Sequence, residues 1–369
     1  MRIEHLSIKN FRNYVQAELD FKEGVNLIFG DNAQGKTNLL EAIYMAATTR
    51  SFRGGKDREM IRWEQQSGHI AVTIRKDGIS HKIDMHLETG KRKAAAIDGL
   101  PIRKSGELLG LLHTVAFSPD DLDMIKEGPD RRRRFLDMEL CQLDKLYLSR
   151  LSEYNKALAQ RNALLKQLGT DKELISTLDI WDRELSKAAE YVIRERTRFV
   201  EELAPILGEK HAVLTKGKET LSISYEPNIS AEEMFDRLKK TRERDCFLKT
   251  TGTGPHRDDI QFRIGNMDVR TYGSQGQQRT VVLALKLSEI ELVKKKIQDL
   301  PILLLDDVLS ELDRNRQLQL LGEMKDVQTI VTCTGMEELI RERNGQNRIF
   351  LVKEGNVKEI KEDIHESGL

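Results

Sequence analysis

The strongest chemical pattern in the chain is an octapeptide that matches the phosphate-loop pattern GxxxxGK[ST] at every fixed position. Together with the asparagine that follows, its residues are Gly30, Asp31, Asn32, Ala33, Gln34, Gly35, Lys36, Thr37 and Asn38. Glycines at both ends let backbone N–H groups wrap a phosphate, and the following helix points its positive end at it. We expect Lys36 to neutralise the β and γ phosphates of a nucleotide and the Thr37 hydroxyl to ligate Mg²⁺.

A second pattern is an apolar run, Ile302 to Leu305, that ends in the carboxylates of Asp306 and Asp307. A buried strand delivers its last side chains to the carboxyl edge of a parallel sheet, where ligands bind. We expect Asp306 to bind Mg²⁺, and Asp307 to act beside Lys36 by orienting or deprotonating a water. Acidic residues also end many strands for structural reasons, so this interpretation depends on the phosphate loop in the same chain.

The third pattern lies just ahead of a long predicted helix and reads YGSQGQQ over residues 272–278. Ser274 followed three residues later by Gln277 satisfies the capping-box rule, which explains both side chains without any ligand. A helix start with exposed N–H groups and a nearby glycine, here Gly276, is also an anion site. Both interpretations stay open at this point.

These patterns need elements that bring them together, and the first third of the chain predicts strands and one helix. The run VNLIF at 25–29 predicts a buried strand before the phosphate loop, and NLLEAIYMAA predicts the helix after it. Two Asp-Gly pairs, Asp77-Gly78 and Asp98-Gly99, separate strand-like segments and predict hairpins. We therefore expect an antiparallel layer in this part of the chain.

The middle of the chain changes to a helical period. Over residues 140–168 apolar side chains recur at steps of three, four or seven, which marks one face of a long helix. Gly169 and Thr170 break the pattern, and a second helical pattern starts at Leu178. We expect an antiparallel helical hairpin of about 30 residues per arm, too short for an extended coiled coil. It would belong to an inserted helical domain over residues 116–255.

The last third returns to an α/β pattern. A helix is predicted over Gln275–Lys296 and apolar strands over Pro301–Leu305 and Thr329–Cys333. The closing segment predicts a hairpin that turns at Gly355 and Asn356. Because strands and helices are mixed in the first and last thirds of the chain, we expect an α/β fold.

The composition is that of a folded protein. The chain has 60 basic and 60 acidic side chains among 369 residues, with 39% hydrophobic residues. No apolar run approaches the roughly 18 residues that cross a bilayer, and the start of the chain lacks the apolar stretch of a secretory signal. The three cysteines form no CxxC pair, which argues against a zinc site or a disulfide framework. We expect a cytoplasmic protein.

Three stretches of the chain are rich in basic residues: residues 50–62, residues 91–104 and Arg131–Arg134. Such charges can bind a phosphate backbone, or they can simply solvate a surface. The net charge of zero does not decide between these interpretations, because phosphate binding depends on where positive charges cluster.

The order of the motifs resembles that of the ABC-type ATPases, in which Walker A, a signature, Walker B and a D-loop follow one another. The D-loop would be LSELD at residues 309–313. The segments LSIKNFRNY, TTRSFR, TGPHRDD and YGSQGQQR resemble, more narrowly, the bacterial recombination mediators with SMC- and Rad50-like heads. This resemblance implies an ABC-type P-loop ATPase head over residues 1–115 and 256–369, with an antiparallel β subdomain and an inserted helical domain.

The resemblance also implies that ATP and Mg²⁺ lie between two copies of the chain, with Walker A of one facing the signature of the other. Ser274, Gly276 and Gln277 would touch the γ-phosphate in trans. Arg12 and Asn13 would lie near the nucleotide, or else form only a polar strand end. The implied activity is a weak, DNA-stimulated ATPase whose homodimer clamps duplex or gapped DNA and helps RecO and RecR load RecA.

Three departures from the wider ABC pattern indicate slow turnover. Asp307 stands where most of these ATPases have Glu, no switch histidine follows Val331, and no clear Q-loop glutamine occurs over Ser118–Asp121. ATP would then act chiefly as a dimer clamp. Two other functions fit a phosphate loop. A transport-coupled ATPase subunit would need a surface for membrane-domain helices, and a metabolic kinase would need no role for Ser274.

Overall fold

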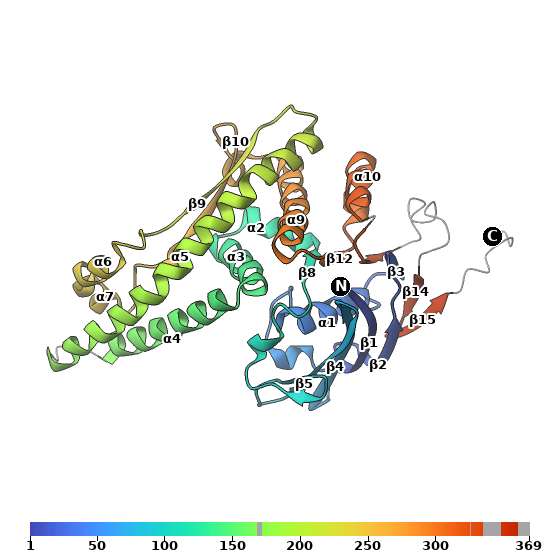
Figure 1. Ribbon diagram of the computed structural model, residues 1–369, viewed down its shortest axis with the longest axis horizontal. Coiled ribbons are helices and arrows are strands. Elements are labelled where there is room, and N and C mark those ends of the chain that lie inside the picture. Colours follow the sequence, from blue (N-terminus) through green and yellow to red (C-terminus); the bar gives the residue numbers. More distant parts are fainter. Residues whose placement is uncertain (168–171, 325, 335–347, 361–369) are drawn as a thin grey trace. The chain divides into compact units, whose positions relative to one another are not determined.

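The computed structural model describes residues 1–167, 172–324, 326–334 and 348–360, and its internal contacts divide the chain into two compact units (Figure 1). The first unit is Met1–Asp121 with Glu289–Leu369, and the second is Leu122–Ser288. The sequence predicts an inserted domain over 116–255, whereas contacts group the chain as far as residue 288 with the helices. Among the residues described, no helix is both long enough and apolar enough to span a bilayer.

One sheet of the first unit is antiparallel, with the strand order β2-β1-β4-β5-β6-β7. Its strands are β1 (Arg2–Phe11), β2 (Tyr14–Asp20), β4 (Ser67–Lys76), β5 (Ile79–Glu88), β6 (Ala94–Ile97) and β7 (Leu100–Pro101). The two predicted Asp-Gly hairpins join β4 to β5 and β6 to β7. Asp77 and Asp98 have φ angles of 51° and 53°, and a glycine with positive φ follows each, as these turns require.

The other sheet of the first unit has the order β15-β14-β3-β13-β12-β8 and is parallel except for β15, which pairs antiparallel with β14. Its strands are β3 (Val25–Phe29), β8 (Thr114–Phe117), β12 (Ile302–Asp306), β13 (Thr329–Cys333), β14 (Arg348–Lys353) and β15 (Asn356–Ile360). Every residue of β12 and β13 is buried, as expected of parallel strands covered on both faces. The predicted strands and closing hairpin are confirmed, but the hairpin turns at Glu354 and Gly355, because Asn356 already pairs with Lys353.

Helix α1 (Lys36–Thr48) contacts both sheets, reaching β1 and β4 in one and β12 and β13 in the other. Nearly all of its residues are buried, which explains the continuous apolar sequence NLLEAIYMAA. This burial fixes the helix start, and with it the phosphate loop. The other helical segments of this unit are η1 (Asp57–Met60), η2 (Ser105–Leu108), η5 (Leu309–Glu311) and α10 (Arg314–Glu323).

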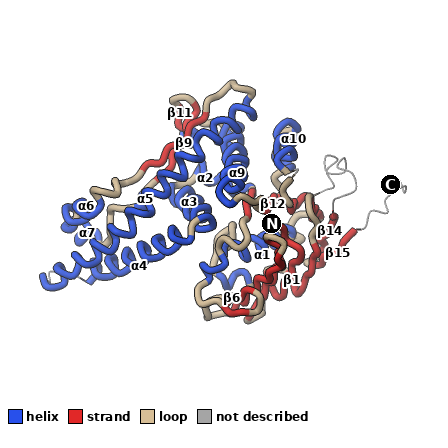
Figure 2. The backbone as a smooth tube through the Cα atoms, in the orientation of Figure 1, coloured by secondary structure: helices blue, strands red, loops and turns tan. Residues whose placement is uncertain are grey.

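The second unit is built on two long helices, α4 (Lys145–Gln167) and α5 (Lys172–Thr215), which lie side by side (Figures 1 and 2). Arg161 bonds to Asp182, and Arg196 to Tyr147, so the helices run antiparallel as predicted. With 44 residues, α5 is longer than the arm of about 30 that the sequence predicts.

The predicted first helix of this hairpin is divided in the structure. It consists of α3 (Pro129–Leu143) and α4, with Asp144 between them in an extended conformation at φ −137°. The side chain of Asp144 accepts a hydrogen bond from the backbone N–H of Leu146, which stabilises the new helix start. The predicted break at Gly169 and Thr170 lies outside the described residues.

A three-stranded sheet of order β11-β10-β9 completes the second unit. Its strands are β9 (Leu221–Glu226), β10 (Asp259–Ile264) and β11 (Met267–Asp268). Because β10 pairs with β9, and β11 pairs with β10, residues after 255 group with the helices. The helical segments of this unit that remain are α2 (Asp123–Lys126), α6 (Met234–Lys240), α7 (Arg242–Leu248), η4 (Pro255–Arg257) and α8 (Val269–Tyr272). Two further segments have residues in both units: η3 (Pro119–Leu122) and α9 (Gln275–Ile297).

Candidate nucleotide-binding site

The phosphate loop connects β3 to α1 and depends on backbone conformations that favour glycine. Gly30 and Gly35 have φ angles of 154° and 113°, and Ala33 between them has φ 63°. A Cβ atom at Gly30 would lie 2.2 Å from the carbonyl oxygen of Val352, which is backbone and cannot rotate away. A Cβ atom at Gly35 would lie 2.5 Å from Asn13 Nδ2. The loop can therefore turn its N–H groups toward an anion, as the sequence predicts.

Lys36 is only 4% exposed, and its ammonium group is bound within the loop. Its Nζ donates to the carbonyl oxygens of Gly30 at 2.9 Å and Asp31 at 3.0 Å. The same Nζ lies 4.0 Å from Asp307 Oδ2. The positive charge of Lys36 is thus held at the start of α1. The N-terminus of the helix also attracts anions, so both features favour a bound phosphate.

Thr37 and Asp306 meet as a Mg²⁺ site requires, although they are 269 positions apart in the sequence. The Thr37 hydroxyl donates to Asp306 Oδ1 at 2.8 Å, and the Thr332 hydroxyl of β13 donates to the same oxygen at 2.8 Å. Burial raises the pKa of Asp306, and the charge of Asp307 raises it further, while the two hydroxyl hydrogen bonds lower it.

The chemistry of these donors fits Mg²⁺. Hydroxyl and carboxylate oxygens are the protein ligands that this ion prefers. A bound cation would also stabilise the buried carboxylate of Asp306, which burial otherwise disfavours in its charged form. Thr37 and Asp306 are therefore the residues that would hold the ion.

Asp307 lies one residue beyond β12 in the left-handed region, with φ 52°. Its backbone N–H donates to Thr332 Oγ1 at 2.9 Å. Its Oδ1 atom is buried and has no hydrogen-bond partner among the described residues. A carboxylate oxygen in this state can accept a hydrogen bond from a water, which is what the predicted catalytic role needs.

Of the two residues predicted near the nucleotide, Asn13 contacts the phosphate loop and Arg12 does not. Asn13 lies against the phosphate loop, because its Nδ2 donates to the carbonyl of Gln34 and its Oδ1 accepts from Asn38, each at 2.8 Å. The guanidinium of Arg12 instead pairs with both carboxylate oxygens of Glu41, at 2.8 and 2.7 Å. Asn13 thus supports the loop directly, whereas Arg12 is anchored on α1.

Further contacts support the site, and one of the residues that make them, Glu41, is not predicted from the sequence. Glu41 is fully buried in α1 and accepts from Arg12 and from the Ser51 hydroxyl. Gln34 accepts from the backbone N–H of Glu354 at 2.5 Å, which ties the loop to the closing hairpin. A charged residue inside the apolar run LLEAIYMAA was the one available signal for Glu41, since buried charges need partners.

The predicted signature residues lie in the second unit, with Ser274 between α8 and α9 and with Gly276 and Gln277 in the first turn of α9. Ser274 Oγ accepts from the Gln277 N–H at 3.2 Å, and Gln277 Oε1 accepts from the Ser274 N–H at 2.9 Å. This is the capping box that the spacing predicts. Gln277 Nε2 also donates to Glu219 at 2.8 Å. Ser274 and Gly276 are exposed, so the start of α9 is accessible to a ligand.

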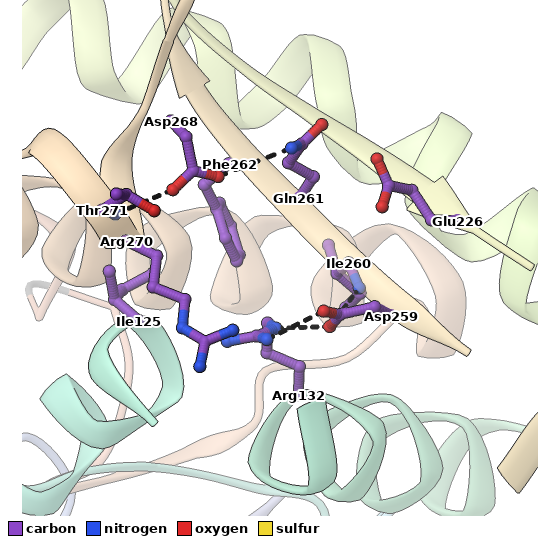
Figure 3. A pocket seen from close by; sticks show the side chains of 10 residues that line it. All are labelled: Ile125, Arg132, Glu226, Asp259, Ile260, Gln261, Phe262, Asp268, Arg270 and Thr271. Carbon is purple, nitrogen blue, oxygen red and sulfur yellow. Dashed lines mark hydrogen bonds and ion pairs between the residues drawn. The ribbon is translucent and has the colours of Figure 1, made fainter. Parts of the chain in front are cut away.

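The segment that leads into the signature carries a small pocket of about 160 Å³, which Figure 3 shows. Arg132 of α3 and Asp259 of β10 face each other there in a two-bond pair of 2.6 and 2.9 Å. Asp268 caps α8 by accepting from the Thr271 N–H at 2.7 Å. These contacts fix the strand and the short helix that precede Ser274.

The basic run Arg131–Arg134 therefore has a structural role in part. Arg132 is buried against Asp259, and Arg133 donates to the carbonyl oxygen of Asp258 at 2.6 Å. Arg131 pairs with Glu127 at 2.9 Å. The run connects α3 to its surroundings and is not an unpaired cationic patch.

The two other basic stretches lie side by side in the first unit. Lys93 Nζ is 2.9 Å from Asp57 Oδ1 and donates to the carbonyl oxygen of Thr49 at 2.5 Å, which joins residues 91–104 to residues 50–62. Most of the basic side chains in these stretches are exposed: Arg50, Arg53, Lys56, Arg58, Lys91, Arg92, Arg103 and Lys104.

The sequence matches known proteins over nearly its whole length. A family model described as "RecF/RecN/SMC N terminal domain" matches residues 2–358. The chain is 52% identical over 358 residues to the "DNA replication and repair protein RecF" of Lachnoclostridium phytofermentans, covering 97% of this chain and 99% of that protein. It is 51% identical over 359 residues to the protein of the same name from Lachnospira eligens, with the same coverage.

Solved structures agree with this match. The chain superposes on a structure described as "the recombination mediator protein RecF-ATP in RecFOR pathway" with a TM-score of 0.90, 36% identity and 98% of each chain covered. The Smc head domain of Pyrococcus furiosus gives a TM-score of 0.55 at 18% identity, with 97% of this chain and 96% of that chain covered. That second likeness supports the predicted ABC-type head fold.

Proposed function

Because this chain belongs to the RecF/RecN/SMC family, and within it to the RecF proteins, we propose that it is an ATP-dependent DNA-binding protein of DNA replication and recombinational repair. One observation supports the proposal most strongly. The Thr37 hydroxyl and the Asp306 carboxylate meet at 2.8 Å beside the buried ammonium of Lys36, which is the arrangement that binding a Mg²⁺–nucleotide needs.

ATP binding would use groups that are already in position. The backbone N–H groups of the loop and the start of α1 surround the phosphates, and Lys36 exchanges its bonds to the loop carbonyls for phosphate oxygens. Thr37 and Asp306 hold the ion. Bound Mg²⁺ supplies positive charge that neutralises the phosphate oxygens.

Hydrolysis would depend on Asp307, which orients the attacking water and accepts its proton. Its carboxylate is one methylene shorter than the glutamate of most ABC-type ATPases. No switch histidine follows Val331 in the sequence. We therefore expect weak turnover that resets a clamp, with stimulation by DNA.

Assembly would follow from the position of the signature. The exposed start of α9, with Ser274, Gly276 and Gln277, offers helix N–H groups to the γ-phosphate bound by a second copy. Those donors gain a partner only when a triphosphate is present, so nucleotide controls association. The chain would form an ATP-dependent homodimer.

Closure of two copies would create the DNA site. The adjacent basic stretches 50–62 and 91–104 carry exposed Lys and Arg side chains suited to a duplex backbone, or to the junction of a gap. The relatives' place in the RecFOR pathway supports RecR, with RecO, as partners and RecA as the protein whose loading is assisted.

Sedimentation velocity with a non-hydrolysable ATP analogue tests this function. Wild type is expected to change from monomer to dimer on adding the analogue, and to retain duplex DNA better in that state. Lys36→Arg and Ser274→Arg are expected to stay monomeric, because each removes one side of the composite site. Dimerisation of Ser274→Arg at the wild-type analogue concentration would contradict the proposal.

A further inference from the structure

Thr332 is fully buried in β13, directly beside Asp306 in the register of the parallel pair β12–β13. Its Oγ1 atom is 2.8 Å from Asp306 Oδ1 and 2.9 Å from the backbone nitrogen of Asp307. A hydroxyl has one hydrogen to donate and lone pairs to accept with. The hydroxyl of Thr332 therefore donates to the carboxylate of Asp306 and accepts from the amide of Asp307.

This hydroxyl completes a chain of hydrogen bonds across three elements. Thr37 of α1 and Thr332 of β13 both donate to Oδ1 of Asp306, at the end of β12. Two donors on one oxygen fix the rotation of the carboxylate, and so the direction of its other oxygen.

The same hydroxyl holds Asp307 in an unfavourable backbone conformation. At φ 52°, Asp307 is in the left-handed region, which is unfavourable for an L residue. Such a conformation persists when its surroundings fix it, and the bond from its N–H to Thr332 does so. The position of the Asp307 carboxylate near Lys36 thus depends on Thr332.

Packing alone does not account for a threonine here. The neighbouring residues in β13 are apolar and buried: Ile330, Val331 and Cys333. Valine has nearly the same shape as threonine and would avoid burying a hydroxyl. A buried hydroxyl that bonds to both members of the carboxylate pair indicates a role in the site.

We propose that Thr332 is a positioning residue for ATP hydrolysis, which fixes the carboxylate of Asp306 and the backbone of Asp307 relative to Lys36 and Thr37. It acts through these residues and does not touch the nucleotide. This inference rests on the proposed ATPase function.

The test compares Thr332→Val, which removes the hydroxyl and keeps the shape, with Thr332→Ser, which keeps the hydroxyl. In Thr332→Val we expect turnover to fall at least tenfold, while the Mg²⁺ concentration needed for half-maximal retention of an ATP analogue rises several-fold. Analogue-driven dimerisation at saturating Mg²⁺ should persist. Thr332→Ser should stay within about threefold of wild type in both measurements.

Thr329→Val is the matched control. Thr329 is equally buried in the same strand, and its hydroxyl donates to the Val327 carbonyl at 3.1 Å, outside the site. This variant should hydrolyse ATP as wild type does. If Thr332→Val does not fold, Thr332→Ala takes its place in the comparison with Thr332→Ser.

Two outcomes would overturn the inference: wild-type turnover in Thr332→Val, or equal losses in the valine and serine variants, which would assign the effect to packing. The proposed function is judged separately on wild type. A wild-type protein that neither hydrolyses ATP nor dimerises with the analogue contradicts the function itself, whereas an active wild type with an unaffected Thr332→Val contradicts only the role of Thr332.

Discussion

At the scale of single residues, both hydroxyl donors of Asp306, Thr37 and Thr332, reach the same carboxylate oxygen. An asparagine at this position keeps an oxygen that accepts both hydrogen bonds but loses the negative charge. Replacing Asp306 with asparagine therefore separates the contribution of the side chain to stability from its contribution to cation binding.

Asp306→Asn is expected to leave the melting temperature of the nucleotide-free protein within a few degrees of wild type, because a buried charge is removed while its hydrogen bonds remain. The rise in melting temperature on adding ATP and Mg²⁺ should be largely lost. Thermal unfolding with and without Mg²⁺–ATP measures both effects. The exposed Asp120→Asn serves as the control, and a full Mg²⁺–ATP shift in Asp306→Asn would rule out Asp306 as a ligand.

Gly30→Ala tests the conformation of the loop. Its Cβ would meet the Val352 carbonyl at 2.2 Å, so we expect a loss of stability of about 2 kcal/mol or more, together with a loss of ATP binding. Gly128→Ala is the matched control, because nothing lies within 4 Å of its Cβ position and its φ is −69°. Chemical denaturation measures the free energy of unfolding, and equal values for the two variants would disprove the steric argument.

The candidate site residues that the structure brings together could be selected from the sequence because they form contiguous patterns. The phosphate loop is read from eight adjacent positions, and the carboxylate pair ends a visible apolar strand. Thr332 and Glu41 could not be predicted, since their roles come from partners on other elements. The spacing of residues along a single sequence does not reveal which strands pair in the sheet.

At the scale of elements, the start of η4 packs a neutral histidine against α4. His256 Nε2 lies 3.0 Å from the carbonyl oxygen of Thr251, so this nitrogen carries the proton, and Nδ1 accepts from the Tyr154 hydroxyl at 2.5 Å. Burial lowers the pKa of His256 from 6.5 to about 4.

This shift predicts that the second unit loses stability in acid. Because the folded pKa is below the unfolded one, the unfolded chain binds the extra proton first as the pH falls. Stability is therefore complete above pH 6.5 and decreases as the pH falls toward 4, by about 2 kcal/mol at pH 5. His256→Gln should be less stable at pH 8, where Tyr154 loses its acceptor, but its stability should depend less on pH.

Trp181 on α5 provides the measurement, because it packs against the core of the second unit. A Trp63→Phe background removes the other tryptophan, which is 85% exposed in the first unit. Fluorescence-detected urea unfolding at pH 5 and pH 8 then measures the stability of the second unit alone. The same pH dependence with and without His256 would contradict the assignment.

Element predictions were accurate where one period or one turn signal dominated. The Asp-Gly hairpins and the helix after the signature are found where the sequence places them. The division at Asp144 was missed because apolar spacing continues through it, and the length of α5 was underestimated. Strand β9 shows the alternation LSISYE, so its pattern was available in the sequence.

At the scale of the whole molecule, DNA binding should depend on the joined basic stretches of the first unit. Arg103→Glu with Lys104→Glu is expected to weaken duplex binding about tenfold or more at moderate salt and to reduce the salt dependence of the affinity. Lys240→Glu with Arg244→Glu, on exposed positions of the second unit, changes the same charge elsewhere. Fluorescence anisotropy across a salt series measures both, and equal losses in the two double variants would exclude a localised site.

The division of the molecule into units was only partly visible in the sequence. The helical period marks where the insertion begins to differ from the head, but strand pairing by β9 determines which later residues join it. Pairing between distant strands leaves no local signal. The limits that follow from contacts, 122–288, therefore differ from the limits 116–255 that the sequence pattern and the family resemblance imply.

If one copy's phosphate loop and another copy's signature share a single ATP, two variants that are each defective should restore the site when they are mixed. Lys36→Arg and Ser274→Arg damage opposite sides of that site, so a mixed dimer contains one intact composite site. Sedimentation with the ATP analogue should show monomers for each variant alone and dimers for the equimolar mixture. A mixture that stays monomeric under conditions where wild type dimerises contradicts the claim.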